Sequence, residues 1–181
     1  MNSGALLVIE DDADVRHAAR IALLGEFPRI DLLGAPAAEL ETQLTTGNYD
    51  AVLLDMNFVA GERSGAAGLD ALARIHACDG TLAVVLMTAY GGVQLAVQAL
   101  KRGATDFVLK PWHNDRLVTT IEAAAQITRT RRDAEAQTLD QLERGAIERA
   151  LVRAEGNISV AAATLGLSRP ALYRRMSKHG L

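Results

Sequence analysis

The feature that most constrains the fold of this chain is a series of short apolar segments that alternate with helical patterns. Continuously apolar strands are typical of a parallel sheet whose two faces are both covered by helices. We therefore predict an α/β fold, with a doubly wound five-stranded parallel sheet over residues 1–127. The predicted strands are ALLVI (5–9), a weaker segment near Ile30–Leu33, AVLLD (51–55), LAVVLM (82–87) and TDFVLK (105–110).

The segments between these strands have apolar residues at the spacing typical of helices. We expect helices over residues 13–24, from Pro36 to about Thr46, over residues 68–77, and from Asn114, a plausible N-cap, to Ile127. The segment 128–138 carries several charges without apolar periodicity. It is either a linker or a solvent-exposed extension of the preceding helix.

The C-terminal residues have a different pattern, typical of a small all-α unit. An amphipathic helix is expected over 139–154 and ends at Gly156-Asn157, after which Ser159 and Ser168 can each cap a short helix. Two short helices joined by a turn at Gly166 predict a helix-turn-helix.

The charge is unevenly divided between these two parts. Residues 1–127 hold 9 Lys and Arg against 16 Asp and Glu, whereas residues 128–181 hold 10 against 6. A basic end suits a polyanionic partner, although a solvated helix face would look the same. Cys78 is the single cysteine, and no apolar run approaches the roughly 18 residues that span a bilayer, so we expect a cytoplasmic protein.

Polar side chains gather where the predicted strands end. These ends share one rim of a parallel sheet, where such folds bind their ligands. Converging carboxylates repel each other unless a divalent cation lies among them, and hard oxygen ligands favour Mg²⁺. A metal, a lysine, a hydroxyl and a nucleophilic carboxylate together could receive a phosphoryl group. The residues concerned are Glu10, Asp11, Asp12, Asp55, Thr88 and Lys110.

Residues 4–127 resemble the receiver domain of two-component response regulators. The motifs that carry the resemblance are VIEDDADVR, AVLLDMN, VVLMTAY and GATDFVLKPW. The resemblance implies a flavodoxin-like (CheY-like) sheet of strand order 2-1-3-4-5 and a sensor histidine kinase as phosphoryl donor.

The same resemblance assigns roles to individual residues. Asp55 matches the phospho-acceptor, with Thr88 and Lys110 as its catalytic partners, and Thr88 and Phe107 match the switch pair. Counting back from Arg16 makes Asp11 the direct Mg²⁺ ligand and Glu10 its outer partner, with Asp12 as a neighbour. The remaining implied ligands are Asp55 itself and the backbone carbonyl of Asn57. A cis Lys110–Pro111 bond is also implied.

The loop after Asp55 departs from the family pattern. Val59 stands where a proline is usual, and the stretch MNFVAGERSGAAGLD delays the next helix. This loop is similar to that of a nitrogen-regulator-like receiver subgroup. It could alter the choice of kinase or be a passive insertion.

Residues 139–181 closely resemble the helix-turn-helix of the Fis family, which binds double-stranded DNA as a dimer. The last helix has cations and no acids, which suits the major groove. The alternative is a small dimerisation bundle with an incidentally basic face. The residues we expect to face DNA are Ser159, Ser168, Arg169, Tyr173, Arg174, Arg175 and Lys178.

We therefore expect a phosphorylation-controlled, homodimeric DNA-binding regulator and not an enzyme. Segment 128–138 is too short to hold the ATPase domain that usually joins a receiver to a Fis-type unit, and no GxxxxGK[ST] motif occurs. An aspartate phosphatase is disfavoured because Asn57 stands where such enzymes carry a second catalytic aspartate. An interaction module whose C-terminal helices do not read DNA remains the alternative.

Overall fold

The computed structural model describes residues 4–35, 39–58, 65–89 and 93–181. The chain divides into two compact units, Met1–Arg131 and Arg132–Leu181. The division falls inside the segment 128–138 that we predict as a linker between domains 4–127 and 139–181.

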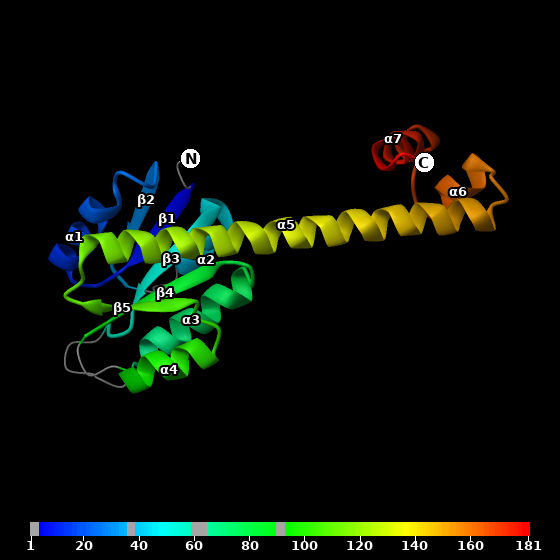
Figure 1. The fold of residues 1–181 in the computed structure, drawn as a ribbon. Coiled ribbons are helices and arrows are strands. Elements are labelled where there is room, and N and C mark those ends of the chain that lie inside the picture. The colour runs from blue at the N-terminus through cyan, green and yellow to red at the C-terminus, as the bar shows by residue number, and fades with distance from the viewer. Residues whose placement is uncertain (1–3, 36–38, 59–64, 90–92) are drawn as a thin grey trace. The chain divides into compact units, whose positions relative to one another are not determined.

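The first unit is built on a five-stranded parallel sheet, which confirms the predicted fold class (Figure 1). Its order is β2-β1-β3-β4-β5, and every neighbouring pair is parallel. The sheet therefore brings the carboxyl ends of β1, β3, β4 and β5 to one edge. The strands are β1 (Ala5–Ile9), β2 (Arg29–Leu33), β3 (Tyr49–Asp55), β4 (Ala83–Ala89) and β5 (Asp106–Lys110).

Helices cover both faces of this sheet. One face packs against α1 (Ala13–Leu23) and the first part of α5 (Asn114–Arg153), through side chains such as Leu23 and Ile121. The other face packs against α2 (Leu40–Gly47), α3 (Ala66–Cys78) and α4 (Val93–Lys101). The helix expected from Pro36 begins at Leu40, and Pro36 itself lies outside the described residues.

Helix α5 is continuous from Asn114 to Arg153, so residues 128–138 are helical. Asn114, expected as its cap, is its first helical residue. Thr128 is fully buried, and its hydroxyl accepts a hydrogen bond from the Ala83 backbone N–H at 2.8 Å. This bond ties α5 to the first residue of strand β4.

The second unit packs the end of α5 against α6 (Ile158–Thr164) and α7 (Arg169–His179). Asn157, not Ser159, is the N-cap of α6: its backbone is extended, and its side chain accepts from the Ser159 and Val160 N–H groups. Ser168 caps α7 as expected. The buried residues that hold the three helices together are Ile147, Ala150, Ala161, Ala162 and Leu172.

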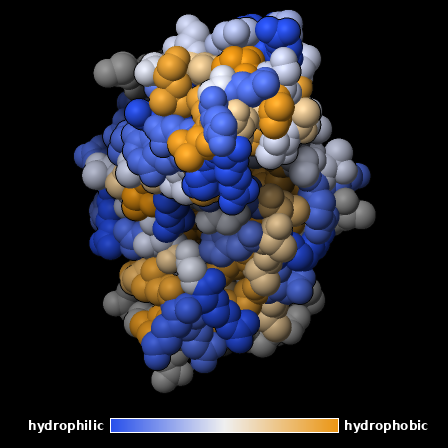
Figure 2. Space-filling model, turned by 90° about the vertical axis from the view of Figure 1, so that its right-hand side faces the viewer, coloured by the Kyte–Doolittle hydropathy of each residue, from blue (hydrophilic) through white to orange (hydrophobic). Residues whose placement is uncertain are grey.

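On the face that Figure 2 shows, hydrophobic residues lie interspersed among hydrophilic ones. Among the residues that the structure describes, no helix combines the length and the apolar character needed to cross a membrane.

We expect Thr128→Val to destabilise the first unit by about 1–3 kcal/mol, because it leaves a buried N–H of Ala83 without an acceptor at almost unchanged side-chain volume. Urea unfolding can be followed through Trp112, the only tryptophan in the sequence, which packs against this unit's core. Thr130→Val is the matched control, since the exposed Thr130 hydroxyl donates to the Gln126 carbonyl oxygen within the same helix and not to another element of the described chain. Equal effects of the two substitutions would contradict the assigned role of Thr128.

Candidate functional site

A buried ion triad lies at the carboxyl edge of the sheet. Lys110 Nζ, at the end of β5, is 2.5 Å from Glu10 Oε2 and 2.7 Å from Asp55 Oδ1. The Glu10 side chain is 1% exposed and that of Asp55 5%. Both carboxylates have thus lost most of their hydration and depend on Lys110 for compensation.

The triad leaves negative charge unbalanced, because Asp11 lies beside it. Glu10, Asp11 and Asp55 each offer a carboxylate oxygen, and these oxygens lie within 4.8 Å of one another. One ammonium group offsets only one of the three charges. This all-oxygen donor set therefore fits a hard divalent cation such as Mg²⁺.

The pKa values of the triad follow from burial and pairing. Burial of its carboxyl group raises the pKa of Glu10, against the opposing effect of Lys110. Burial works to lower the pKa of Lys110, but hydrogen bonds to Asp55 and Glu10 outweigh it and raise that pKa. Lys110 therefore stays charged and can hold an anionic group at this edge.

Arg16 fixes the backbone that carries two of these acids. Its guanidinium donates to the carbonyl oxygens of Glu10 at 2.6 Å and Asp11 at 3.2 Å. Asp12 differs from its neighbours, because its side chain caps α1 by accepting from the Asp14 and Val15 N–H groups. Only Glu10 and Asp11 of the three consecutive acids belong to the cluster.

The backbone after β3 folds against Asp55. The Asn57 N–H donates to Asp55 Oδ2 at 3.0 Å, and the Asn57 amide oxygen is buried without a hydrogen-bond donor among the described residues. Gly68 of α3 packs closely here, since a Cβ atom added to it would lie 2.7 Å from Met56 Cα. Val59, where the loop departs from the family pattern, lies outside the described residues.

Thr88 and Phe107 lie on one face of the sheet. Thr88 is 1% exposed, and within residues 4–35, 39–58, 65–89 and 93–181 its hydroxyl has a single, long contact of 3.5 Å, to the Ala89 carbonyl oxygen. Phe107 pairs in register with Leu86, two residues before Thr88, and is half-buried against the core on the α3 side. The weakly bonded hydroxyl can turn to another acceptor. The Lys110–Pro111 bond is cis, as the resemblance implies.

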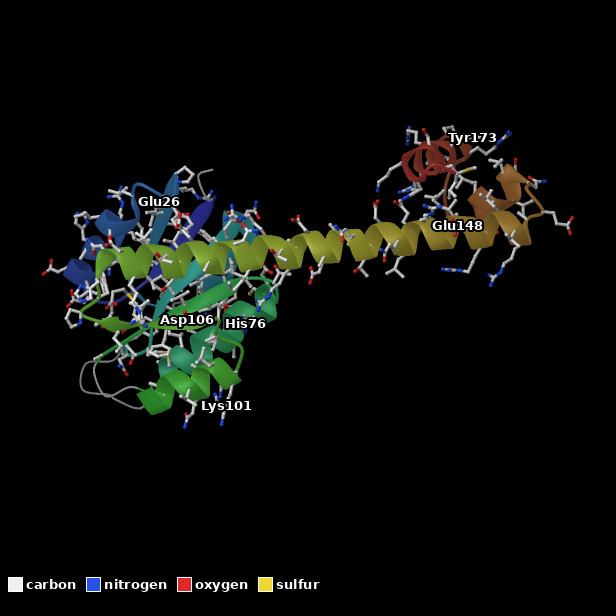
Figure 3. All side chains as sticks on the ribbon, in the orientation of Figure 1. Glu26, His76, Lys101, Asp106, Glu148 and Tyr173 are labelled. Carbon is white, nitrogen blue, oxygen red and sulfur yellow. The ribbon has the colours of Figure 1, made fainter. Side chains whose placement is uncertain are left out.

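The helix-turn-helix residues divide into two groups. Ser159, Ser168, Arg169, Tyr173 and Arg174 are exposed; Figure 3 labels Tyr173 on α7. Arg175, which is partly buried, and Lys178, which is exposed, form ion pairs with Glu143 and Asp140 of α5.

Sequence reasoning missed the acids Asp140 and Glu143 because it treated the last helix in isolation. Their spacing of three residues, which places both on one side of α5, is the signal that could have found them. The side chain of His179 is only 5% exposed because it packs between these acids.

Comparisons with known proteins agree with this two-part organisation. The sequence model of the response regulator receiver domain matches residues 6–122. That of the bacterial regulatory proteins of the Fis family matches residues 138–179.

Several proteins are similar to the chain. The C4-dicarboxylate transport transcriptional regulatory protein DctD of Pseudomonas aeruginosa is 34% identical over 130 residues, which cover 68% of this chain and 26% of that protein. The chain spans between about a quarter and just over half of the length of the curated relatives it matches.

Solved structures share the fold. The receiver domain of a Bacteroides fragilis response regulator is 39% identical, with a TM-score of 0.61, over 67% of this chain and 96% of that one. Full-length FixJ from B. japonicum is 25% identical, with a TM-score of 0.63, over 98% of this chain and 88% of that one.

We expect MgCl₂ to raise the melting temperature of the first unit, because a cation that binds only the folded cluster stabilises it, by about 2.7 kcal/mol at 100 times its Kd. Asp11→Asn should largely remove this response, measured by Trp112 fluorescence. Asp12→Asn is the control: it removes the same charge, and asparagine still caps a helix. A magnesium response that survives in Asp11→Asn would contradict the assigned cluster.

Proposed function

The chain belongs to the response regulator receiver family, and we propose that it is a DNA-binding response regulator whose receiver accepts a phosphoryl group on Asp55. The observation that carries this proposal is the buried Asp55 carboxylate, bonded by Lys110 and by the Asn57 N–H beside two further acids. The donor is a phosphohistidine of a sensor histidine kinase: its P–N bond breaks while an Asp55 oxygen forms a P–O bond.

Each surrounding residue contributes to this transfer. Lys110 offsets the charge of the incoming phosphoryl oxygens, and Arg16 holds the backbone of Glu10 and Asp11. Glu10, Asp11, Asp55 and the Asn57 carbonyl would hold the ion. Bound Mg²⁺ would supply charge neutralisation at the phosphoryl oxygens.

Phosphorylation biases the receiver between two conformations. The new group adds about −1.5 to −2 charges at the rim. The Thr88 hydroxyl, whose contact with the Ala89 carbonyl oxygen is long, turns towards a phosphoryl oxygen, and Phe107 moves into the space it leaves. The phosphoryl group shifts the equilibrium only as far as it binds the active conformation better.

The output is sequence-specific binding of double-stranded DNA by a homodimer. Helix α7 carries Arg169, Tyr173 and Arg174 at exposed positions, and its N-cap Ser168 is exposed as well. Ser159 lies in the first turn of α6. Arginine can donate a bidentate pair to guanine in the major groove, and the other groups suit phosphates. Receiver dimerisation would control this binding.

Acetyl phosphate with MgCl₂ should add the mass of one phosphoryl group to the peptide that contains Asp55, because the acid cluster and Lys110 favour transfer at that oxygen. Mass spectrometry of the intact protein and its peptides measures this. Asp55→Asn should abolish the addition, and Asp50→Asn, which changes an acid earlier on the same strand, should leave it. If the native protein gains no mass, the proposed receiver function is wrong.

Genome-wide mapping should recover a defined set of sites for the native protein and fewer or weaker sites for Asp55→Ala. The combined variant Arg169→Ala and Arg174→Ala should lose them, since each lost base contact costs about 1–3 kcal/mol. The control combines Arg102→Ala with Arg116→Ala, two exposed arginines of the first unit. Sites that persist without Arg169 and Arg174 would favour a module whose C-terminal helices do not read DNA.

A further inference from the structure

An ion-pair network joins the last turns of α7 to α5. Arg175 Nε donates to Glu143 Oε1 at 2.6 Å, and Lys178 Nζ lies 2.5 Å from Asp140 Oδ1 and 3.3 Å from Glu143 Oε2. His179 Nε2 lies 2.9 Å from Glu143 Oε2. A single carboxylate thus serves three side chains of α7.

The position of each cationic residue on α7 determines whether it joins the network or remains unpaired. Arg175 and His179 are four residues apart and lie on the side that faces α5, next to the buried Leu172. Tyr173 and Arg174 are exposed on other sides of the helix. Among the described residues, Arg169 and Arg174 take part in no ion pair, so these two guanidinium groups are available to an outside anion.

The acidic and basic side chains of the network balance in charge, which stabilises it. Asp140 and Glu143 supply two negative charges, and Arg175 and Lys178 supply two positive ones. Hydrogen bonds from His179, and after it from Arg175 and Lys178, lower the pKa of Glu143 to about 2. The carboxylate therefore remains ionised at neutral pH.

We propose that Glu143 is a positioning residue that withholds Arg175 and Lys178 from the DNA backbone, so that α7 meets DNA through Arg169, Tyr173 and Arg174. This inference rests on the proposed DNA binding and deepens it. An arginine that already bonds a carboxylate gains little by exchanging it for a phosphate, and a locally neutral network releases few counterions. The non-specific attraction of α7 to the DNA backbone is thereby reduced, and contacts with the bases contribute a larger share of the binding free energy.

Asp140, Glu143 and His179 also lie close enough to share a metal ion. The Arg175 and Lys178 donors already occupy their carboxylates, so we assign the cluster to positioning.

The test is the dependence of DNA affinity on KCl concentration, measured with the full chain and a random-sequence duplex. Each phosphate contact contributes about 0.9 to the slope of log K against log salt. On a random-sequence duplex, which offers no preferred base, the unpaired Arg174 should contact a phosphate, so Arg174→Gln should lower the slope by about 0.9. Arg175→Gln should leave the slope unchanged, because Arg175 already bonds Glu143. Glu143→Gln should steepen it by about 0.9 and tighten binding to this duplex, because a released cation can then reach a phosphate.

Glu148→Gln is the matched control for Glu143→Gln. Glu148 lies on the same helix (Figure 3) and pairs with Arg144 of that helix, so its loss changes the net charge equally without removing Asp140 or Glu143 from α7. The slope in Glu148→Gln should stay at the native value. Circular dichroism checks that each variant is folded; if Arg175→Gln is not, Lys178→Gln, at a side chain 55% exposed, replaces it.

Equal slope losses in Arg174→Gln and Arg175→Gln would overturn the proposal, as would equal slopes in Glu143→Gln and Glu148→Gln. If no variant binds DNA, the proposed function fails, and heparin chromatography then tests the network separately. Glu143→Gln should elute from heparin at higher salt than Glu148→Gln, and co-elution would overturn the network's role.

Discussion

The first unit depends on one lysine that compensates two buried carboxylates. Glu10 follows β1 and Asp55 ends the neighbouring strand β3, and Lys110 reaches both from the end of β5, across β4 in the sheet. Removing one partner of such a cluster leaves an uncompensated buried charge, which costs far more than the pairing itself contributes. Two buried acids at this rim therefore require a lysine that can reach them, and the strand order determines the distance that its side chain must span.

Most of the first unit could be predicted from the sequence because its strands are short, apolar and bounded by charged residues. Such continuously apolar segments predict strands that are buried on both faces of a parallel sheet. Parallel pairing then places the carboxyl ends of these strands, and with them residues 10, 55 and 110, at one edge. The second strand was the weakest prediction because β2 is an edge strand, with residues such as Arg29 and Ile30 only partly buried or exposed.

The structure differs from the sequence-based predictions where tertiary geometry decides which of several similar residues takes a given role. Ser159 and Asn157 are both good capping residues, and backbone conformation, which composition does not show, selects Asn157. The pairing of Arg175 and Lys178 depends on where α7 packs along α5, so a count of cations on α7 overestimates those free to bind DNA. Likewise, the charged segment 128–138 is helical because it continues a helix whose first turns are held by core packing.

Substitution of Gly68 is expected to disturb the site around Asp55, although Gly68 has no side chain in it. It is uncharged and belongs to a helix on one face of the sheet, yet it packs directly against the backbone that follows Asp55. Any larger residue there must displace that backbone and, with it, the Asn57 N–H that bonds the carboxylate. Natural or selected alleles that silence signalling can therefore arise at a glycine, with every acidic residue and Lys110 intact.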